Sequence, residues 1–323
     1  ADRAAMSRAL IEAAAHAGIR MTLLPVLYMT GGFDERPLEP RQRRFGHALD
    51  DYLTLLAQLR RMENDRLRVG VALHSLRAVP AGAMPALLEA LAGHDYPIHL
   101  HIAEQLAEVE QCLATRGARP VCWLLDHAPV DARWTLVHAT HLDAGEISGI
   151  AASGACVSIC PTTEGNLGDG LFPLRAFLDA GGRFSIGSDS HVSVSPVEEL
   201  RWLEYGQRLI SHRRNLASEP GTPGTGEALL RHAWAGGAQG AGLPLGCLQE
   251  GAFADLIVLD PDAPALAGAR DGDVLERFVF AGNRPLVAET WIGGQRVVAE
   301  GRHRERETIA RRYARTLRCL LAG

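Results

Sequence analysis

Three segments of the sequence carry histidines and carboxylates at spacings that suit hydrolytic chemistry. The first, residues 97–105, reads Pro-Ile-His-Leu-His-Ile-Ala-Glu-Gln. In a strand, His99 and His101 would point to the same side, and Glu104 would follow at the strand end. A neutral imidazole in that place can bind a metal, and a carboxylate beside it can transfer protons. Taken alone, the segment fits a pair of hydrogen-bonded core histidines and a helix N-terminal glutamate equally well.

The two later segments add a second histidine and an aspartate. His138 ends an apolar, strand-like run, and Asp189 follows another such run two residues after Gly187. Alone, each also fits a structural histidine or a helix-capping aspartate. The ordered set of His101, Glu104, His138 and Asp189 predicts more than its parts, because each residue lies at or near the end of a successive strand. It indicates a hydrolase with one divalent metal ion, expected to be zinc, which lowers the pKa of bound water to about 7.

All 33 basic residues of the chain are arginine. The absence of lysine excludes Schiff-base catalysis, a phosphate-loop lysine and a carboxylated lysine bridging two metals. A hydrolytic metal centre in this chain must therefore be built from His, Asp, Glu or Cys. A phosphate-binding barrel enzyme is disfavoured as well, since no Gly-rich phosphate loop occurs in the required context.

The charge and cysteine content limit the partners and the compartment. The formal net charge is −5, and the arginine clusters are short, so we expect neither nucleic-acid nor membrane partners. No apolar run is long enough to span a bilayer. The six cysteines are scattered without a CxxC pair, which is typical of reduced thiols in a cytoplasmic protein.

Apolar strand-like runs alternate with amphipathic helical patterns through residues 1–244. We expect strands at 21–27, 68–73, 97–101, 135–138, 155–159 and 184–187, and helices at 43–62, 84–92, 104–114, 145–152 and 197–210. Polar residues recur just after these strands: His74 and Arg77, His101 and Glu104, His138 and His141, residues 162–166, and Asp189 and His191. Such convergence favours an α/β fold, the (β/α)8 TIM-type metallohydrolase barrel with about six βα units visible, over an open doubly wound sheet.

The pattern changes after residue 244. We expect a small β-sandwich element at 245–303, with strands at 251–260, 279–280, 287–292 and 296–298, and a C-terminal helix at 304–323. A closed barrel needs eight strands, whereas six are visible and the chain opens on a helical pattern at 2–17. We therefore expect that the first barrel strands are missing from this chain.

The four site residues resemble those of the amidohydrolase superfamily, in its branch of mononuclear deaminases. The resemblance implies that His101 and Asp189 bind the metal and that Glu104 and His138 transfer protons, with Asp189 taking part in the catalysis. The superfamily also carries an HxH ligand pair at the end of its first barrel strand. The HxH of this chain, His99 with His101, matches the later strand, and His16 and His47 do not replace the missing pair. We therefore expect weak metal binding and little activity from this chain alone.

Longer stretches are similar to the formimidoylglutamate deiminases. They are residues 23–28, 42–45, 74–79, 99–105, 160–170, 188–191 and 198–205, of which Pro-Thr-Thr-Glu-Gly-Asn-Leu-Gly-Asp-Gly at 161–170 is the most diagnostic. The similarity runs through nearly the whole chain. It implies hydrolysis of N-formimidoyl-L-glutamate to N-formyl-L-glutamate and ammonia in histidine degradation, and it leads us to expect a homodimer.

A dicarboxylate substrate needs cationic, planar recognition. Arginine provides this through paired hydrogen bonds, and we expect Arg77 together with His74 to bind the substrate. Two alternatives stay open: another deaminase of the same branch, acting on a nucleobase or triazine ring, and a non-catalytic barrel that serves as a binding scaffold.

Overall fold

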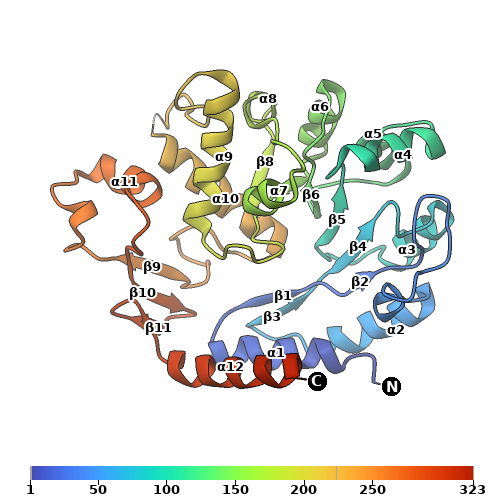
Figure 1. Ribbon diagram of the computed structural model, residues 1–323, viewed down its shortest axis with the longest axis horizontal. Helices are drawn as coiled ribbons and strands as arrows, with labels where there is room; N and C mark the ends of the chain where they lie inside the picture. The colour runs from blue at the N-terminus through green and yellow to red at the C-terminus, as the bar shows by residue number, and fades with distance from the viewer. Residues whose placement is uncertain (1, 223, 323) are drawn as a thin grey trace.

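The computed structural model describes residues 2–222 and 224–322, and six parallel strands form its central sheet (Figure 1). In spatial order they are β2 (Val26–Leu27), β4 (Val71–Ser75), β5 (Ile98–Ile102), β6 (Trp134–His138), β7 (Cys156–Ile159) and β8 (Arg183–Ile186). Two further strands, β1 (Met21–Leu23) and β3 (Leu67–Val69), form a separate parallel pair. In the chain, β1 comes just before β2, and β3 comes just before β4. The six predicted strands are confirmed, and the first two are each divided by a short break.

The break between β3 and β4 falls at Gly70. A Cβ atom at this position would lie 2.7 Å from side-chain atoms of Leu24 and Pro97. Glycine is therefore required by the close approach of neighbouring chain segments. The break between β1 and β2 includes Pro25, which has no N–H to donate to a sheet.

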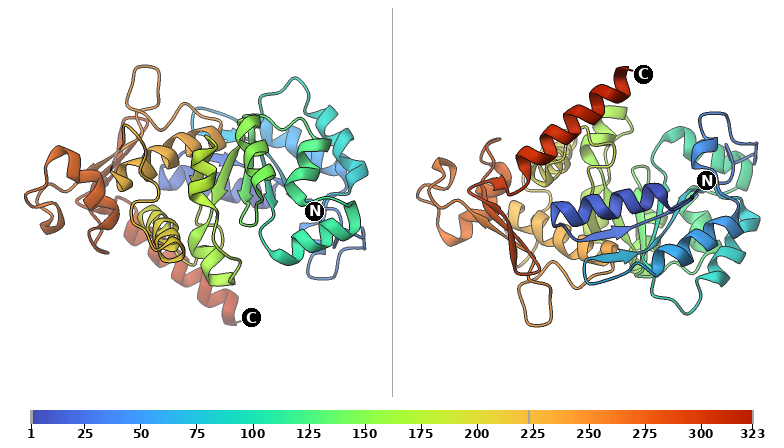
Figure 2. Two further views of the ribbon diagram at one scale, coloured as in Figure 1. Left: turned by 90° about the horizontal axis from the view of Figure 1, so that it is seen from above. Right: turned by 90° about the horizontal axis from the view of Figure 1, so that it is seen from below.

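Helices surround the strands on the outer side of the arc that they form (Figure 1; Figure 2 shows the same arrangement from above and below). The sequence predicted α1 (Ala5–Ala17), α2 (Leu49–Arg60), α3 (Met84–Ala90), α4 (Leu106–Arg116), α6 (Ala144–Ser153) and α9 (Pro196–Ser211). It did not predict α5 (Pro120–His127), α7 (Pro161–Leu167), α8 (Leu174–Asp179) or α10 (Thr225–Ala241). The first three of these have only six to eight residues, and α10 is rich in small residues.

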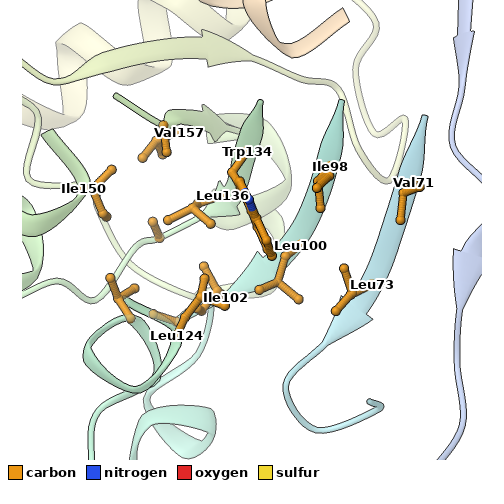
Figure 3. Close-up of a cluster of buried hydrophobic side chains, with 14 of the residues drawn as sticks. Val71, Leu73, Ile98, Leu100, Ile102, Leu124, Trp134, Leu136, Ile150 and Val157 are labelled. Carbon is orange, nitrogen blue, oxygen red and sulfur yellow. The ribbon is translucent and has the colours of Figure 1, made fainter. Parts of the chain in front are cut away.

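The core lies between the strands and these helices. Alternate strand residues point into it, and Figure 3 shows Val71, Leu73, Ile98, Leu100, Ile102, Trp134, Leu136 and Val157 with Leu124 of α5 and Ile150 of α6. Burying each such side chain contributes about 1.5–3 kcal/mol. Because side chains alternate along a strand, this burial forces His99 and His101 of β5 to the opposite face.

Helix α10 packs closely on β8. A Cβ atom at Gly236 would lie only 2.0 Å from the carbonyl oxygen of Phe184, so glycine alone permits this approach. The helix thereby covers the last strand of the sheet.

A separate four-stranded antiparallel sheet follows, in the order β12-β11-β10-β9. Its strands are β9 (Leu256–Leu259), β10 (Val287–Ile292), β11 (Gln295–Ala299) and β12 (Arg302–His303). The strand predicted at 279–280 is wrong, because these residues end the helix α11 (Val274–Phe280). A short apolar run does not distinguish a strand from a buried helical turn, and here Val279 is fully buried in the main core.

An ion pair joins the part that contains the parallel strands to the segment that carries the antiparallel sheet. The Arg20 guanidinium lies 2.9 Å from the Asp255 carboxylate, and both side chains are largely buried. The chain then ends in α12 (Arg306–Ala322), whose described residues are all partly or fully exposed. Among the described helices, none has the length and apolar character needed to cross a membrane.

Candidate active site

Three predicted histidines meet at the carboxyl ends of neighbouring strands. His74 lies in β4, His101 in β5 and His138 ends β6. The ring centroids of His74 and His101 are 5.3 Å apart, and those of His101 and His138 are 5.6 Å apart in a stacked arrangement. The parallel register accounts for this, since it places Ile102 beside His138 and Ser75 beside His101.

The main chain holds the His101 ring. Its Nδ1 lies 2.7 Å from the carbonyl oxygen of His74, and a carbonyl only accepts, so Nδ1 carries the proton and Nε2 keeps its lone pair. Burial lowers the pKa of His101, which favours the neutral ring that a metal requires. His99, two residues earlier, instead bonds through Nε2 to the Gly240 carbonyl at 2.8 Å. His99 is thus a hydrogen-bonded structural histidine.

The residues at the strand ends fit a metal ion. Possible ligand atoms of His101, His138 and Asp189 all lie within 4.8 Å of one another. Asp189 is exposed and His138 is buried, so the group spans from the core to the surface. Neutral imidazoles with a carboxylate are a donor set that suits zinc.

His138 lies between two carboxylates. Its Nδ1 is 3.3 Å from Glu164 Oε1, and its Nε2 is 3.8 Å from Glu104 Oε1. Burial opposes a charge on the ring, but the hydrogen bond to Glu164 and the charges of Glu104, Glu164 and Asp189 outweigh it, so the pKa of His138 is raised. The pKa of Glu104 is also raised, chiefly by burial. A carboxyl group and an imidazole whose pKa values are both raised therefore face each other, as is common where protons are transferred.

The backbone is strained where these side chains project. In the described part of the chain, five of the nine non-glycine residues with positive φ lie here: Ala103 (50°), His138 (69°), Ala139 (49°), Asp189 (38°) and His191 (57°). Such conformations cost on the order of 1–3 kcal/mol each and persist when the surroundings hold them. Hydrogen bonds from the Ala139 N–H to the Ile102 carbonyl and from the His141 N–H to the Ala103 carbonyl, both 3.0 Å, provide that support.

The two predicted substrate-binding residues lie beside this cluster. Burial, with the charges of His101 and Arg77, lowers the pKa of His74 to about 4, so its ring is neutral at pH 7. The Tyr28 ring meets His74 edge-on at 4.4 Å. Arg77 acts electrostatically on His74, His101 and Glu104, and its Nε is buried without a hydrogen-bond partner among the described residues. An arginine donor without a partner is well suited to a carboxylate ligand.

Sequence reasoning missed Glu164, Asp169 and Glu108. The segment 162–166 was recognised as polar residues after a strand, yet nothing in one sequence shows that Glu164 turns towards His138. Asp169 Oδ2 and Glu108 Oε1 are buried and have no hydrogen-bond partner among the described residues. A surface hollow of about 360 Å³, which includes Tyr205 and Phe280, contains none of these groups.

Comparison with known proteins places the chain among deaminating hydrolases. A model of the amidohydrolase family matches residues 3–297. The formimidoylglutamate deiminase of Pseudomonas aeruginosa is 48% identical over 323 aligned residues, covering 99% of this chain and 71% of that protein. The crystal structure of an amidohydrolase from Brucella melitensis superposes with a TM-score of 0.90 at 41% identity, covering 96% of this chain and 68% of that one. An adenosine deaminase from Xanthomonas campestris with bound zinc shares the fold, with a TM-score of 0.81 at 23% identity over 96% of this chain and 68% of that one.

Proposed function

Because the chain belongs to the amidohydrolase family, we propose that it hydrolyses N-formimidoyl-L-glutamate to N-formyl-L-glutamate and ammonia. Water adds its oxygen to the formimidoyl carbon, the bond from that carbon to the terminal nitrogen breaks, and the nitrogen leaves as ammonia. The observation that carries the proposal is the meeting of His101, Glu104, His138 and Asp189 beside Arg77. The deiminase from Pseudomonas aeruginosa, at 48% identity, supports the choice of substrate.

The proposed roles follow from the geometry. One divalent ion, which we propose to be zinc, would be held by His101 and Asp189 and would lower the pKa of a water bound to it. Asp189 and the Nε2 atom of His138 orient the attacking water and accept its proton. Glu104, 3.8 Å from His138, delivers a proton to the departing nitrogen, and its raised pKa favours the protonated form that this step needs.

The substrate carries two carboxylates, and we propose that Arg77 and His74 bind one of them. Arg77 offers a planar set of donors, of which Nε has no partner among the described residues. His74 is neutral at pH 7, and its Nδ1 lies 3.1 Å from the Ser75 hydroxyl, which can donate to it. The remaining ring N–H of His74 would then donate to the substrate.

A ring deaminase is the second candidate. Nucleobase and triazine rings call for stacking aromatic side chains rather than a cation, whereas the group beside this cluster is Arg77, with Tyr28 turned edge-on to His74. A non-catalytic scaffold would have no need to hold Glu104 and His138 within 4 Å of each other in strained backbone.

We propose that the enzyme acts as a cytoplasmic homodimer in histidine degradation.

Ammonia release tests the proposal. The protein, expressed from its complete coding sequence, is mixed with N-formimidoyl-L-glutamate with and without a chelator. Release that the chelator abolishes and zinc restores is the expected result. A zinc-loaded protein that releases no ammonia from this compound but deaminates a nucleobase or triazine would overturn the assigned substrate and leave the fold intact.

A further inference from the structure

We infer that Glu164 is a positioning residue for His138, which fixes the ring with its proton on Nδ1 and its lone pair on Nε2. The inference deepens the proposed function, because Nε2, whose lone pair is left free in this way, is the proposed proton acceptor.

The hydrogen bonds around Glu164 determine which ring nitrogen is protonated. Glu164 Oε1 lies 3.3 Å from His138 Nδ1 and also accepts the Cys160 N–H at 2.9 Å. A carboxylate has no proton to donate, so Nδ1 must carry one. Nε2, on the other side of the ring, faces Glu104 Oε1 at 3.8 Å. The Glu164 and His138 side chains are 3% and 1% exposed, so water does not compete for this contact.

Hydrogen bonds also hold α7, the helix that carries Glu164, in place. Near the start of α7, the Thr162 N–H and hydroxyl donate to the buried Glu199 carboxylate at 2.9 and 2.6 Å. The next residue, Thr163, meets the Ser190 hydroxyl at 3.0 Å, which joins α7 to the loop that carries Asp189. The carboxylate of Glu164 therefore has a fixed place relative to both proposed proton-accepting groups.

The backbone conformation of His138 makes its ring depend on the contact with Glu164. The φ angle of 69° lies in the left-handed region, which is unfavourable for residues other than glycine, so surrounding contacts must hold the residue and its ring in place. In hydrolytic sites a histidine base commonly acts through one nitrogen while a carboxylate on the other selects the tautomer. Glu164 occupies the place of that carboxylate.

A competing reading makes Glu164 a metal ligand. Possible ligand atoms of His138, Cys160 and Glu164 also lie within 4.8 Å of one another, and all three residues are buried. A metal there would replace the His138–Glu164 hydrogen bond with two coordination bonds. Metal stoichiometry separates the readings, because ours requires no ion at this second group.

The test combines nitrogen NMR with kinetics. In protein labelled with 15N-histidine, with the His138 signals assigned by substitution, we expect the Nδ1–H tautomer in metal-free and zinc-loaded wild type. Glu164→Gln should keep it, because the amide oxygen still accepts from Nδ1. Glu164→Ala should lose it and lower kcat by about 10- to 100-fold, with KM little changed.

Glu199→Gln is the matched control. It also neutralises a buried carboxylate that holds α7 but does not touch His138, so it should lower stability and leave the tautomer unchanged. An Nε2–H tautomer in wild type would overturn the inference even if Glu164→Ala fails to fold. A Glu164→Ala variant with the wild-type tautomer and the wild-type kcat would also overturn the inference. So would a second bound metal ion that is lost in Cys160→Ser, because it would make Glu164 a metal ligand. If wild type releases no ammonia, the proposed substrate fails, while the His138 spectrum still tests the tautomer.

Discussion

The Nδ1 atom of His101 lies 2.7 Å from the carbonyl oxygen of His74, so the main chain at the end of one strand orients the side chain at the end of the next. This bond leaves the lone pair of His101 Nε2 free, so Nε2 is the atom that would bind the proposed metal ion. The neighbouring ring, His138, is held through its own Nδ1 by Glu164. Both rings are therefore held through Nδ1, one by a backbone carbonyl and the other by a carboxylate.

Replacing Glu104 tests the proton-transfer role. Glu104→Gln keeps the shape of the side chain and removes its ability to give and take a proton, so kcat should fall by about 10²- to 10⁴-fold. Metal content should not change, because Glu104 is outside the His101, His138 and Asp189 group. Steady-state kinetics and elemental analysis of the same sample check this. A variant that retains most of its kcat would remove Glu104 from the mechanism.

Replacing Arg77 tests substrate recognition. Arg77→Lys keeps the charge but loses the planar pair of donors, and KM should rise by about 10- to 100-fold. Arg77→Ala should have a larger effect, while zinc content stays at the wild-type level. Arg302→Ala, on an exposed strand, is the control and should leave KM unchanged. Equal KM values for Arg77→Ala and wild type would place the substrate carboxylate elsewhere.

Acid should destabilise the metal-free protein through His74. Its pKa is about 4 in the folded state and about 6.5 when unfolded, so the unfolded state binds the proton more tightly. The contribution of the neutral ring is complete above pH 6.5 and is lost as the pH falls from 6.5 to 4, by up to about 3 kcal/mol. Denaturant unfolding of wild type and His74→Asn at a series of pH values measures the difference. Parallel curves for the two proteins would show that His74 titrates normally.

Two adjacent glycines in α10 test how closely this helix packs on β8, because alanine should destabilise the protein at Gly236 and stabilise it at Gly237. Gly236→Ala places a Cβ atom against the Phe184 carbonyl, so unfolding should become easier by about 1–3 kcal/mol or more. Gly237→Ala meets nothing within 4 Å and should stabilise the helix by up to about 1 kcal/mol. Thermal melts of the two variants beside wild type are sufficient. The same shift for both would mean that α10 does not approach β8 so closely.

The sequence alone was enough to predict the strands of the central parallel sheet and to group several polar residues at their carboxyl ends. Alternation of apolar residues placed Ile98, Leu100 and Ile102 in the core, and the same alternation put His99 and His101 on the other face. Strand ends in a parallel α/β fold converge, which is why His101, His138 and Asp189 could be grouped before their distances were known. These features depend on local periodicity, which a single chain displays directly.

Only the tertiary structure decided which of these residues serve the site and what holds them. His99 and His101 look alike in sequence, but the first bonds to the Gly240 carbonyl, 141 residues away, and the second joins His138. Glu164 contacts His138 across 26 residues, and Val279 lies in a helix and packs in the main core. Such contacts depend on how helices pack against the sheet and on register between strands. Both are set by long-range burial and hydrogen bonding, which leave no periodic signal in the residues themselves.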